Sequence, residues 1–230
     1  SSCKSMEKRL QIIIFFHLFL FSLFAQTPSV KEHIRIPLWA EVDAYPELMQ
    51  EEGFDAEKYP IQKIKEVAPF LISGMVYGWD FVYTPSDKAR NVEEYFEIQE
   101  KKLSDAEIYG ISYSSAWVEN ERLNCWCEYT RTPFQVHNYN LWASIQNPVI
   151  HGYGYGNVSD GFDGIVAAAK DALKNAVREH YRAKIKNKPK EITGSVLIRK
   201  EPLIGIDEGR YTIKLDFFLE YDTIINYNVY

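Results

Sequence analysis

The sequence predicts an α+β protein in which helices pack on one face of an antiparallel sheet. Several segments alternate apolar and polar residues with the period of a strand, and one long segment repeats apolar residues with the period of a helix. Aromatic residues make up 15% of the chain, a content typical of strands and binding surfaces rather than of disordered chains.

Residues 1–25 predict a secretory signal peptide. A basic start at Met6-Glu7-Lys8-Arg9 precedes an apolar run, Leu10 to Phe24, that is shorter than the roughly 20 residues of a membrane-spanning helix. An uncleaved membrane anchor is the alternative. Residues 1–5 precede the first Met and are interpreted as an artefact of the gene start.

Cleavage of this signal is expected to leave an exported chain that begins near Gln26 and contains no membrane span. Its loss changes the formal charge of the chain from −6 to −8, because three basic residues and one acidic residue go with it. Such an acidic chain is a poor candidate for nucleic-acid binding. Because the chain is expected to be exported, we expect the protein in the periplasm or cell envelope.

Residues 26–69 are expected to form a helical lead-in. A first short helix is predicted over residues 47–52, between a proline and a glycine. A second is predicted from Pro60 to Ala68, where Pro69 would end it.

Residues 70–146 are expected to form a first β-α-β-β unit with an extra strand. The patterns predict a strand over residues 73–87 and a helix over 87–103, although 95–98 could also be extended. A hairpin of 108–118 with 122–130 and a strand over 134–145 complete the unit. Cys125 and Cys127 would share one face of their strand, where disulfide geometry is poor, and are expected to be buried packing residues.

Residues 147–230 are expected to form a second β-α-β-β unit. It consists of a strand over 147–156, a helix over 160–186 and a hairpin of 192–200 with 210–221. The common order of elements allows two successive units, but their residues have little identity.

Three glycines at alternate positions, Gly152, Gly154 and Gly156, raise the question of a phosphate-binding loop. Their spacing does not match a dinucleotide-binding fingerprint, and the lysine and hydroxyl residue of a P-loop are absent. On a strand the glycines share one face, which we expect to pack on a stripe of the following helix, namely Ile165, Ala169, Ala172, Ala176 and Ala183. Tyr153 and Tyr155 would then lie on the opposite face.

The sequence contains no motif for a catalytic nucleophile, and no residue is assigned a catalytic or metal-binding role; no cofactor is expected. Glu41 and Asp43 could form an acid/base pair or bind calcium. The surplus of strand aromatics instead favours a binding surface, for which Tyr153 and Tyr155 are the candidate ligand-binding residues.

Two segments resemble exported envelope proteins of unknown function from spirochaete-type bacteria. They are the signal "MEKRLQIIIFFHLFLFSLFAQ" and "GWDFVYTPSDKARNVEEYFE". The segment "GYGYGNVSDGFDGIVAAAKDALKNAVREHY" is similar to the glycine strand and alanine-rich helix of LPP20-like envelope domains. The resemblance implies a non-enzymatic periplasmic module and transfers no site residues.

These observations predict an exported, non-catalytic module that binds or scaffolds an envelope protein or glycan. The alternative is an exported hydrolase of an envelope glycan or peptide that uses carboxylates such as Glu41 and Asp43. An enzyme requires a concave pocket that gathers titratable groups, whereas a binding module presents a flat exposed face or edge.

Overall fold

A computed structural model describes residues 31–44, 49, 54–185 and 187–227. The strands are β1 (His33–Glu41), β2 (Trp79–Thr84), β3 (Tyr95–Glu100), β4 (Ser112–Glu119), β5 (Arg122–Thr130), β6 (Val149–Asn157), β7 (Glu191–Ile198), β8 (Leu203–Asp207) and β9 (Arg210–Ile225). The α-helices are α2 (Tyr59–Val76), α3 (Asp105–Tyr109), α4 (Pro133–Trp142) and α5 (Gly161–Lys184), and short 3-10 helices are η3 (Lys88–Arg90) and η4 (Val158–Asp160). The predicted α+β class is confirmed.

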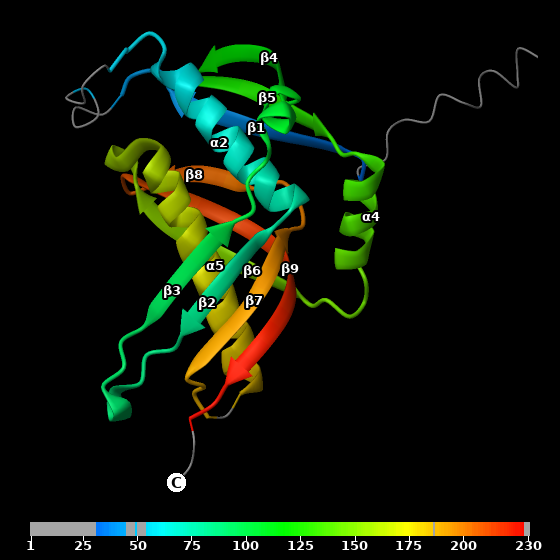
Figure 1. Ribbon diagram of the computed structural model, residues 1–230. Helices are drawn as coiled ribbons and strands as arrows, with labels where there is room; N and C mark the ends of the chain where they lie inside the picture. The colour runs from blue at the N-terminus through cyan, green and yellow to red at the C-terminus, as the bar shows by residue number, and fades with distance from the viewer. Residues whose placement is uncertain (1–30, 45–48, 50–53, 186, 228–230) are drawn as a thin grey trace, which may run out of the picture.

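The strands form two antiparallel sheets (Figure 1). The small sheet has the order β1-β5-β4, and the large sheet has the order β3-β2-β7-β9-β6, with β8 also paired to β9. Helix α2 contacts β1 and β5 of the small sheet and β7 of the large one. Its second half is buried on all sides, as expected for an apolar helix enclosed between two layers.

Helix α5 lies across the inner face of the large sheet at β6, as the glycine pattern predicts. A Cβ atom added to Gly152, Gly154 or Gly156 would lie 2.0, 2.2 or 1.9 Å from a carbonyl oxygen of α5. Four members of the predicted stripe are buried, and Ala183 is exposed. The glycines therefore permit helix–strand contact.

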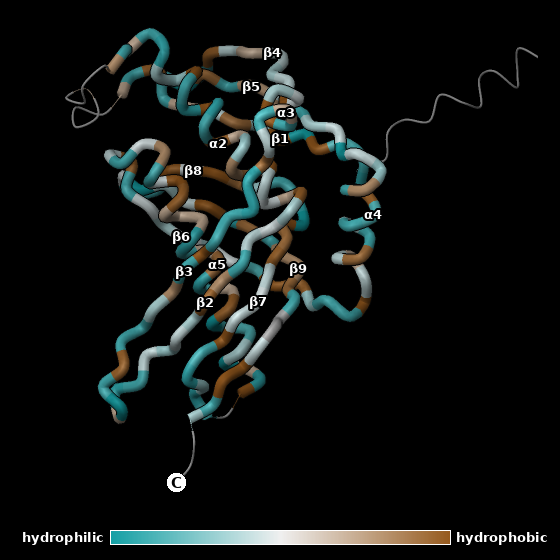
Figure 2. The backbone as a smooth tube through the Cα atoms, in the orientation of Figure 1, coloured by the Kyte–Doolittle hydropathy of each residue, from teal (hydrophilic) through white to brown (hydrophobic). Residues whose placement is uncertain are grey.

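Strand β9 supplies the centre of the core, which Figure 2 shows as hydrophobic stretches of β8 and β9 in the middle of the molecule. The inward-facing residues of β9 are at most 1% exposed: Tyr211, Ile213, Leu215, Phe217 and Leu219. Phe218 points to the opposite, outer face, where it forms a separate cluster with Leu197, Trp142 and Tyr139. Helix α4 thus covers one end of the outer face, an exception to the expectation of helices on one face.

The predicted hairpin of 108–118 with 122–130 is observed as β4 and β5. Its two turn residues, Asn120 and Glu121, have positive φ angles of 51° and 60°, as a two-residue hairpin turn requires. The predicted strand at 147–156 and the helix from 160 correspond to β6 and α5.

The predicted end of the second lead-in helix at Ala68 and the predicted strand from residue 73 are wrong. Helix α2 continues through Pro69 to Val76, and β2 starts at Trp79. The run from Pro69 to Gly78 is mostly apolar. Its sequence pattern therefore cannot distinguish a buried strand from a buried helix. Burial of that segment outweighs the one backbone hydrogen bond that Pro69 cannot donate.

The predicted helix over 87–103 is also wrong, and the extended alternative for 95–98 is correct. These residues form η3 and β3, and a capping box at Ser104 and Glu107 begins α3. The predicted strand over 134–145 is helix α4. Thr132 and Gln135 form a capping box and Pro133 occupies the first turn, a start signal that outweighs the apparent alternation.

The prediction missed two strands: β1, which lies within the expected helical lead-in of residues 26–69, and β8 in the last segment. The turn at Glu208 and Gly209 joins β8 to β9, and β7 pairs with the later part of β9. The large sheet also combines strands from both predicted units. The predicted signal peptide at residues 1–25 and most of the predicted helix over 47–52 lie outside the described residues.

Replacing Gly154 with Ala is expected to lower the free energy of unfolding by about 3 kcal/mol, at the upper end of the usual range for overpacking. The added Cβ would lie 2.2 Å from the Ala168 oxygen and the Ala172 nitrogen. Urea denaturation measures the change. Gly205→Ala is the matched control, because its Cβ meets a single atom, Thr212 Oγ1, at 3.1 Å. Equal stability of the two variants would contradict close packing at β6.

Candidate binding face

Tyr153 and Tyr155 lie on the outer face of β6, opposite the glycines. Their exposed fractions are 43% and 38%. The two rings meet edge to face with centroids 5.1 Å apart, and the Arg210 guanidinium lies 4.4 Å from the centre of the Tyr155 ring. The sheet therefore holds two aromatic side chains side by side at the surface.

The neighbouring strands extend this surface. Tyr153 is directly opposite Lys214 of β9, and Lys214 is in turn opposite Leu203 of β8. Leu203 is 61% exposed. We call Tyr153, Tyr155, Leu203, Arg210 and Lys214 the outer strip. Because neighbouring strands lie about 4.8 Å apart, these side chains form a continuous surface with aromatic, aliphatic and cationic groups.

The free edge of β6 is closed by polar side chains of α5. Asp171 Oδ2 accepts a hydrogen bond from the Tyr155 backbone N–H at 3.2 Å, and Asn175 Nδ2 donates to the Tyr153 carbonyl oxygen at 2.9 Å. An additional strand could not pair with these backbone groups without displacing α5 side chains. A ligand at this end of the sheet would therefore meet the outer strip.

A buried carboxylate lies next to the outer strip. Asp216, with a side chain 3% exposed, contacts His151 Nδ1 and Lys200 Nζ, each at 2.7 Å. Burial would raise the pKa of Asp216, but the hydrogen bonds from His151 and Lys200 outweigh it and hold the pKa below the ordinary aspartate value. Sequence reasoning missed this group, since His151 and Asp216 meet through the register of β6 with β9, and Lys200 reaches Asp216 from the segment after β7.

Glu41 and Asp43, the candidate carboxylate pair, have different environments. Glu41 binds Lys63 Nζ at 2.6 Å and accepts a hydrogen bond from the Tyr211 hydroxyl at 2.9 Å. Lys63 is 2% exposed, and burial lowers the pKa of its ammonium group while Glu41 opposes the change. Asp43 is exposed. The Glu41 carboxylate therefore serves an internal ion pair between β1, α2 and β9.

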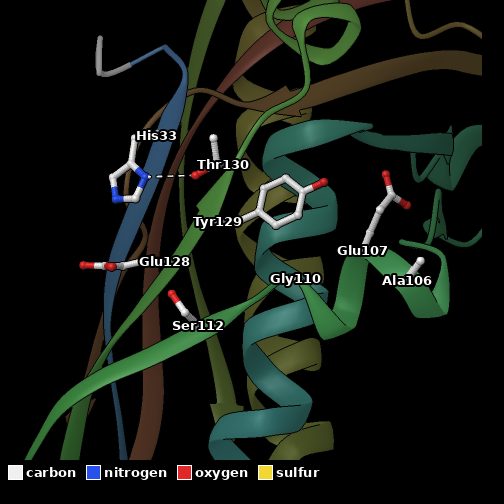
Figure 3. A pocket seen from close by; sticks show the side chains of 8 residues that line it. All are labelled: His33, Ala106, Glu107, Gly110, Ser112, Glu128, Tyr129 and Thr130. Carbon is white, nitrogen blue, oxygen red and sulfur yellow. Dashed lines mark hydrogen bonds between the residues drawn. The ribbon is translucent and has the colours of Figure 1, made fainter. Parts of the chain in front are cut away.

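An open pocket of about 320 Å³ lies between the small sheet and α3 (Figure 3). Its lining includes one imidazole and two carboxylate side chains, those of His33, Glu107 and Glu128. Burial would raise the pKa of Glu107, but hydrogen bonds from Tyr77, Ser104 and Gln135 hold it below its usual range.

The other two groups of this pocket are also engaged. Glu128 pairs with Arg35 at 3.0 Å, and His33 Nδ1 lies 3.5 Å from Thr130 Oγ1. An ionised Glu107 with three donors cannot deliver a proton readily, so these groups are poorly suited to acid/base chemistry.

A second open depression, about 720 Å³, lies over β3, β2 and β7. Its charged groups include Asp80, which pairs with Lys101 at 2.6 Å and accepts a hydrogen bond from Ser195. In the part of the chain that the structure describes, no three His, Cys, Asp or Glu side chains gather as a metal site would require. Cys125 and Cys127 are free and buried, with sulfur atoms 3.7 Å apart.

None of the helices among the described residues is long and apolar enough to cross a membrane. A protein-family model matches residues 22–227 of the chain. The chain belongs to this family.

The chain is also similar to an uncharacterised protein of the spirochaete Treponema pallidum (strain Nichols). The two are 28% identical over 205 residues, which make up 88% of this chain and 86% of that protein. No solved structure matches. The resemblance to uncharacterised spirochaete proteins is thus confirmed, and neither match carries an activity, ligand or partner.

Replacing Glu41 with Gln is expected to destabilise the fold by about 3 kcal/mol, because it leaves the Lys63 ammonium buried without a countercharge. Thermal and urea unfolding followed by circular dichroism measure the loss. Asp43→Asn is the control and should change stability by less than about 0.5 kcal/mol, since its side chain is at the surface. Equal effects of the two changes would contradict a structural ion pair.

Replacing Asp216 with Asn is expected to lower stability at pH 7 by about 2 kcal/mol through weakened charged hydrogen bonds. The folded pKa of Asp216 lies below the unfolded value of about 3.9. Its stabilisation is therefore complete above pH 4 to 5 and disappears as the pH falls through the folded pKa. Urea titrations from pH 7 to 2 should show the wild type and variant converging. Exposed Asp207→Asn serves as control, and a gap independent of pH would contradict the assignment.

Proposed function

We propose that the protein is an exported, non-catalytic binding or scaffolding module of the bacterial envelope. The outer strip would be its ligand-binding surface. The observation that carries this proposal is the partly exposed Tyr153–Tyr155 pair on a flat sheet face whose adjacent edge is closed by α5.

The chemistry of the strip favours a ligand with both apolar faces and polar groups. Tyrosine rings pack against sugar rings or against side chains of a protein, while their hydroxyl groups remain available for hydrogen bonds. Lys214 and Arg210 supply charged donors beside the rings. An envelope glycan or an envelope protein fits these groups, and both were expected from the strand aromatics.

The alternative, a carboxylate-dependent hydrolase, has less support. Glu41 is committed to Lys63 and Tyr211. The pocket carboxylates Glu107 and Glu128 are held by internal partners. A hydrolase needs one carboxyl group free to donate a proton and another free to accept or attack.

Two features of the sequence support the location in the envelope. The apolar run from Leu10 to Phe24 has the form of a secretory signal. The segment from Gly152 to Tyr181 resembles the glycine strand and alanine-rich helix of LPP20-like envelope domains, and the close packing of β6 on α5 supports this comparison. We infer that the mature chain begins near Gln26 and resides in the periplasm or cell envelope.

The double variant Tyr153→Ala/Tyr155→Ala is expected to reduce ligand capture at least about tenfold, since tyrosines often dominate the energy of binding surfaces. The probes are purified peptidoglycan and a solubilised envelope extract, each applied to immobilised protein. Circular dichroism should show an intact fold, because both side chains lie partly in solvent. N-terminal sequencing of the protein isolated from envelope fractions is a separate test, and it should yield an N-terminus near Gln26.

Tyr109→Ala is the matched control, because Tyr109 is 88% exposed on α3 and lies outside the strip. It should leave capture unchanged. Glycosidase and peptidase assays on the same samples test the hydrolase. Turnover that Asp43→Asn abolishes without loss of fold would make the protein an enzyme and overturn the proposal.

A further inference from the structure

Helix α4 turns an apolar stripe toward solvent. Phe134, Leu141 and Ile145, which follows the end of the helix, are 74%, 58% and 102% exposed. The neighbouring side of α4, about 100° around the helix axis, buries Gln135 and packs Trp142 against the large sheet. A surface helix ordinarily has the reverse distribution, with polar residues outward. The stripe is therefore a candidate for contact with an apolar surface outside the described residues.

The segment that contains α4 is also poor in charged residues. Residues 132–159 contain no Asp, Glu, Lys or Arg, although these residues make up 25% of the chain. The segment includes α4, the turn that carries Ile145 and all of β6. The stripe can therefore leave water without desolvating an Asp, Glu, Lys or Arg of its own segment, and desolvation of a charge is the largest penalty for entering an apolar phase.

The chain enters the described body next to α4. Lys31, the first described residue, donates a hydrogen bond from Nζ to Asn140 Oδ1 of α4 at 3.2 Å. Figure 1 shows the start of β1 beside this helix. Six residues, 25–30, separate Lys31 from the apolar run that ends at Phe24, and they can span at most about 20 Å. Before the proposed cleavage near Gln26, a chain held in the membrane by this run would therefore have α4 near the membrane surface.

We propose that the stripe of Phe134, Leu141 and Ile145 inserts into the interfacial region of an envelope membrane. This inference rests on the proposed export and adds peripheral membrane attachment to it. Short apolar side chains on an interfacial helix bind a bilayer by burial at the boundary between headgroups and acyl chains, without spanning it.

A lipid surface fits the stripe better than a protein partner. The side chains protrude singly from a convex helix, and lipid can conform to such a surface. A stable protein interface ordinarily needs about 800 Å² on each side, with a polar or charged rim. Here the surrounding segment has no charged side chain of its own.

Vesicle flotation tests the proposal with the chain that begins at Gln26, so that the apolar run cannot contribute. We expect the wild type to float with phosphatidylcholine vesicles and to remain bound in 0.5 M salt, because the contact is apolar. The variant Leu141→Ser/Ile145→Ser should lower the bound fraction at least about tenfold, in line with the transfer free energy of two exposed aliphatic side chains. Its unfolding curve should match that of the wild type.

Val118→Ser is the matched control, since Val118 is 67% exposed on β4, away from α4. It should float like the wild type, as should Tyr153→Ala/Tyr155→Ala, which separates this inference from the outer strip. Absence of wild-type flotation, or equal flotation of the stripe variant, would overturn the proposal. So would a dimer in sedimentation that the stripe variant dissociates, because a second copy would then cover the stripe.

Discussion

The close approach of α5 to β6 is the contact on which the arrangement of the binding face depends. A Cβ at position 152, 154 or 156 on the inner side of β6 would meet the backbone of α5 at about 2 Å, so glycine is required at these three alternate positions. Alternation then places Tyr153 and Tyr155 on the outer face. The same approach brings Asp171 and Asn175 within reach of the edge of β6. One packing contact thus orients the aromatic pair and closes the neighbouring edge.

A second constraint joins the two sheets. Helix α2 contacts both, and Lys63 on this helix binds Glu41 of β1 and lies against Tyr211 of β9. A buried ion pair gains little over a well-packed apolar contact, but its loss leaves an unpaired charge in the core. Trp39 adds a further link, because its indole N–H donates to the Ile204 carbonyl oxygen of β8 at 3.2 Å. Glu41, which the sequence suggested as a carboxylate of the alternative hydrolase, is therefore part of the buried ion pair that joins the two sheets.

The outer face of the large sheet contains two environments side by side. At one end α4 covers Leu197 and Phe218. Beyond it the sheet is open, first at His151 with Asp216 and then along the outer strip. In an acidic chain, the exposed groups near the tyrosines include the cations Lys214 and Arg210. The proposed membrane contact of α4 and the proposed ligand contact of the strip therefore use separate side chains and can be tested separately.

Local patterns in the sequence determined much of the second half of the fold. Strands β6 and β9 and helix α5 could be predicted because each follows a single period. The glycines of β6 and the apolar residues of β9 alternate as in a strand, and the apolar stripe of α5 has the spacing of a helix. The run before Trp79 was misread because it is buried on all sides, and α4 was missed although Thr132, Pro133 and Gln135 mark its start. The position of Tyr153 and Tyr155 on the outer face was predicted from alternation alone, and the structure shows both partly exposed. The Asp216 group, the role of Glu41 and the outward stripe of α4 were decided by tertiary structure, because sheet register and helix docking bring together residues that share no local pattern.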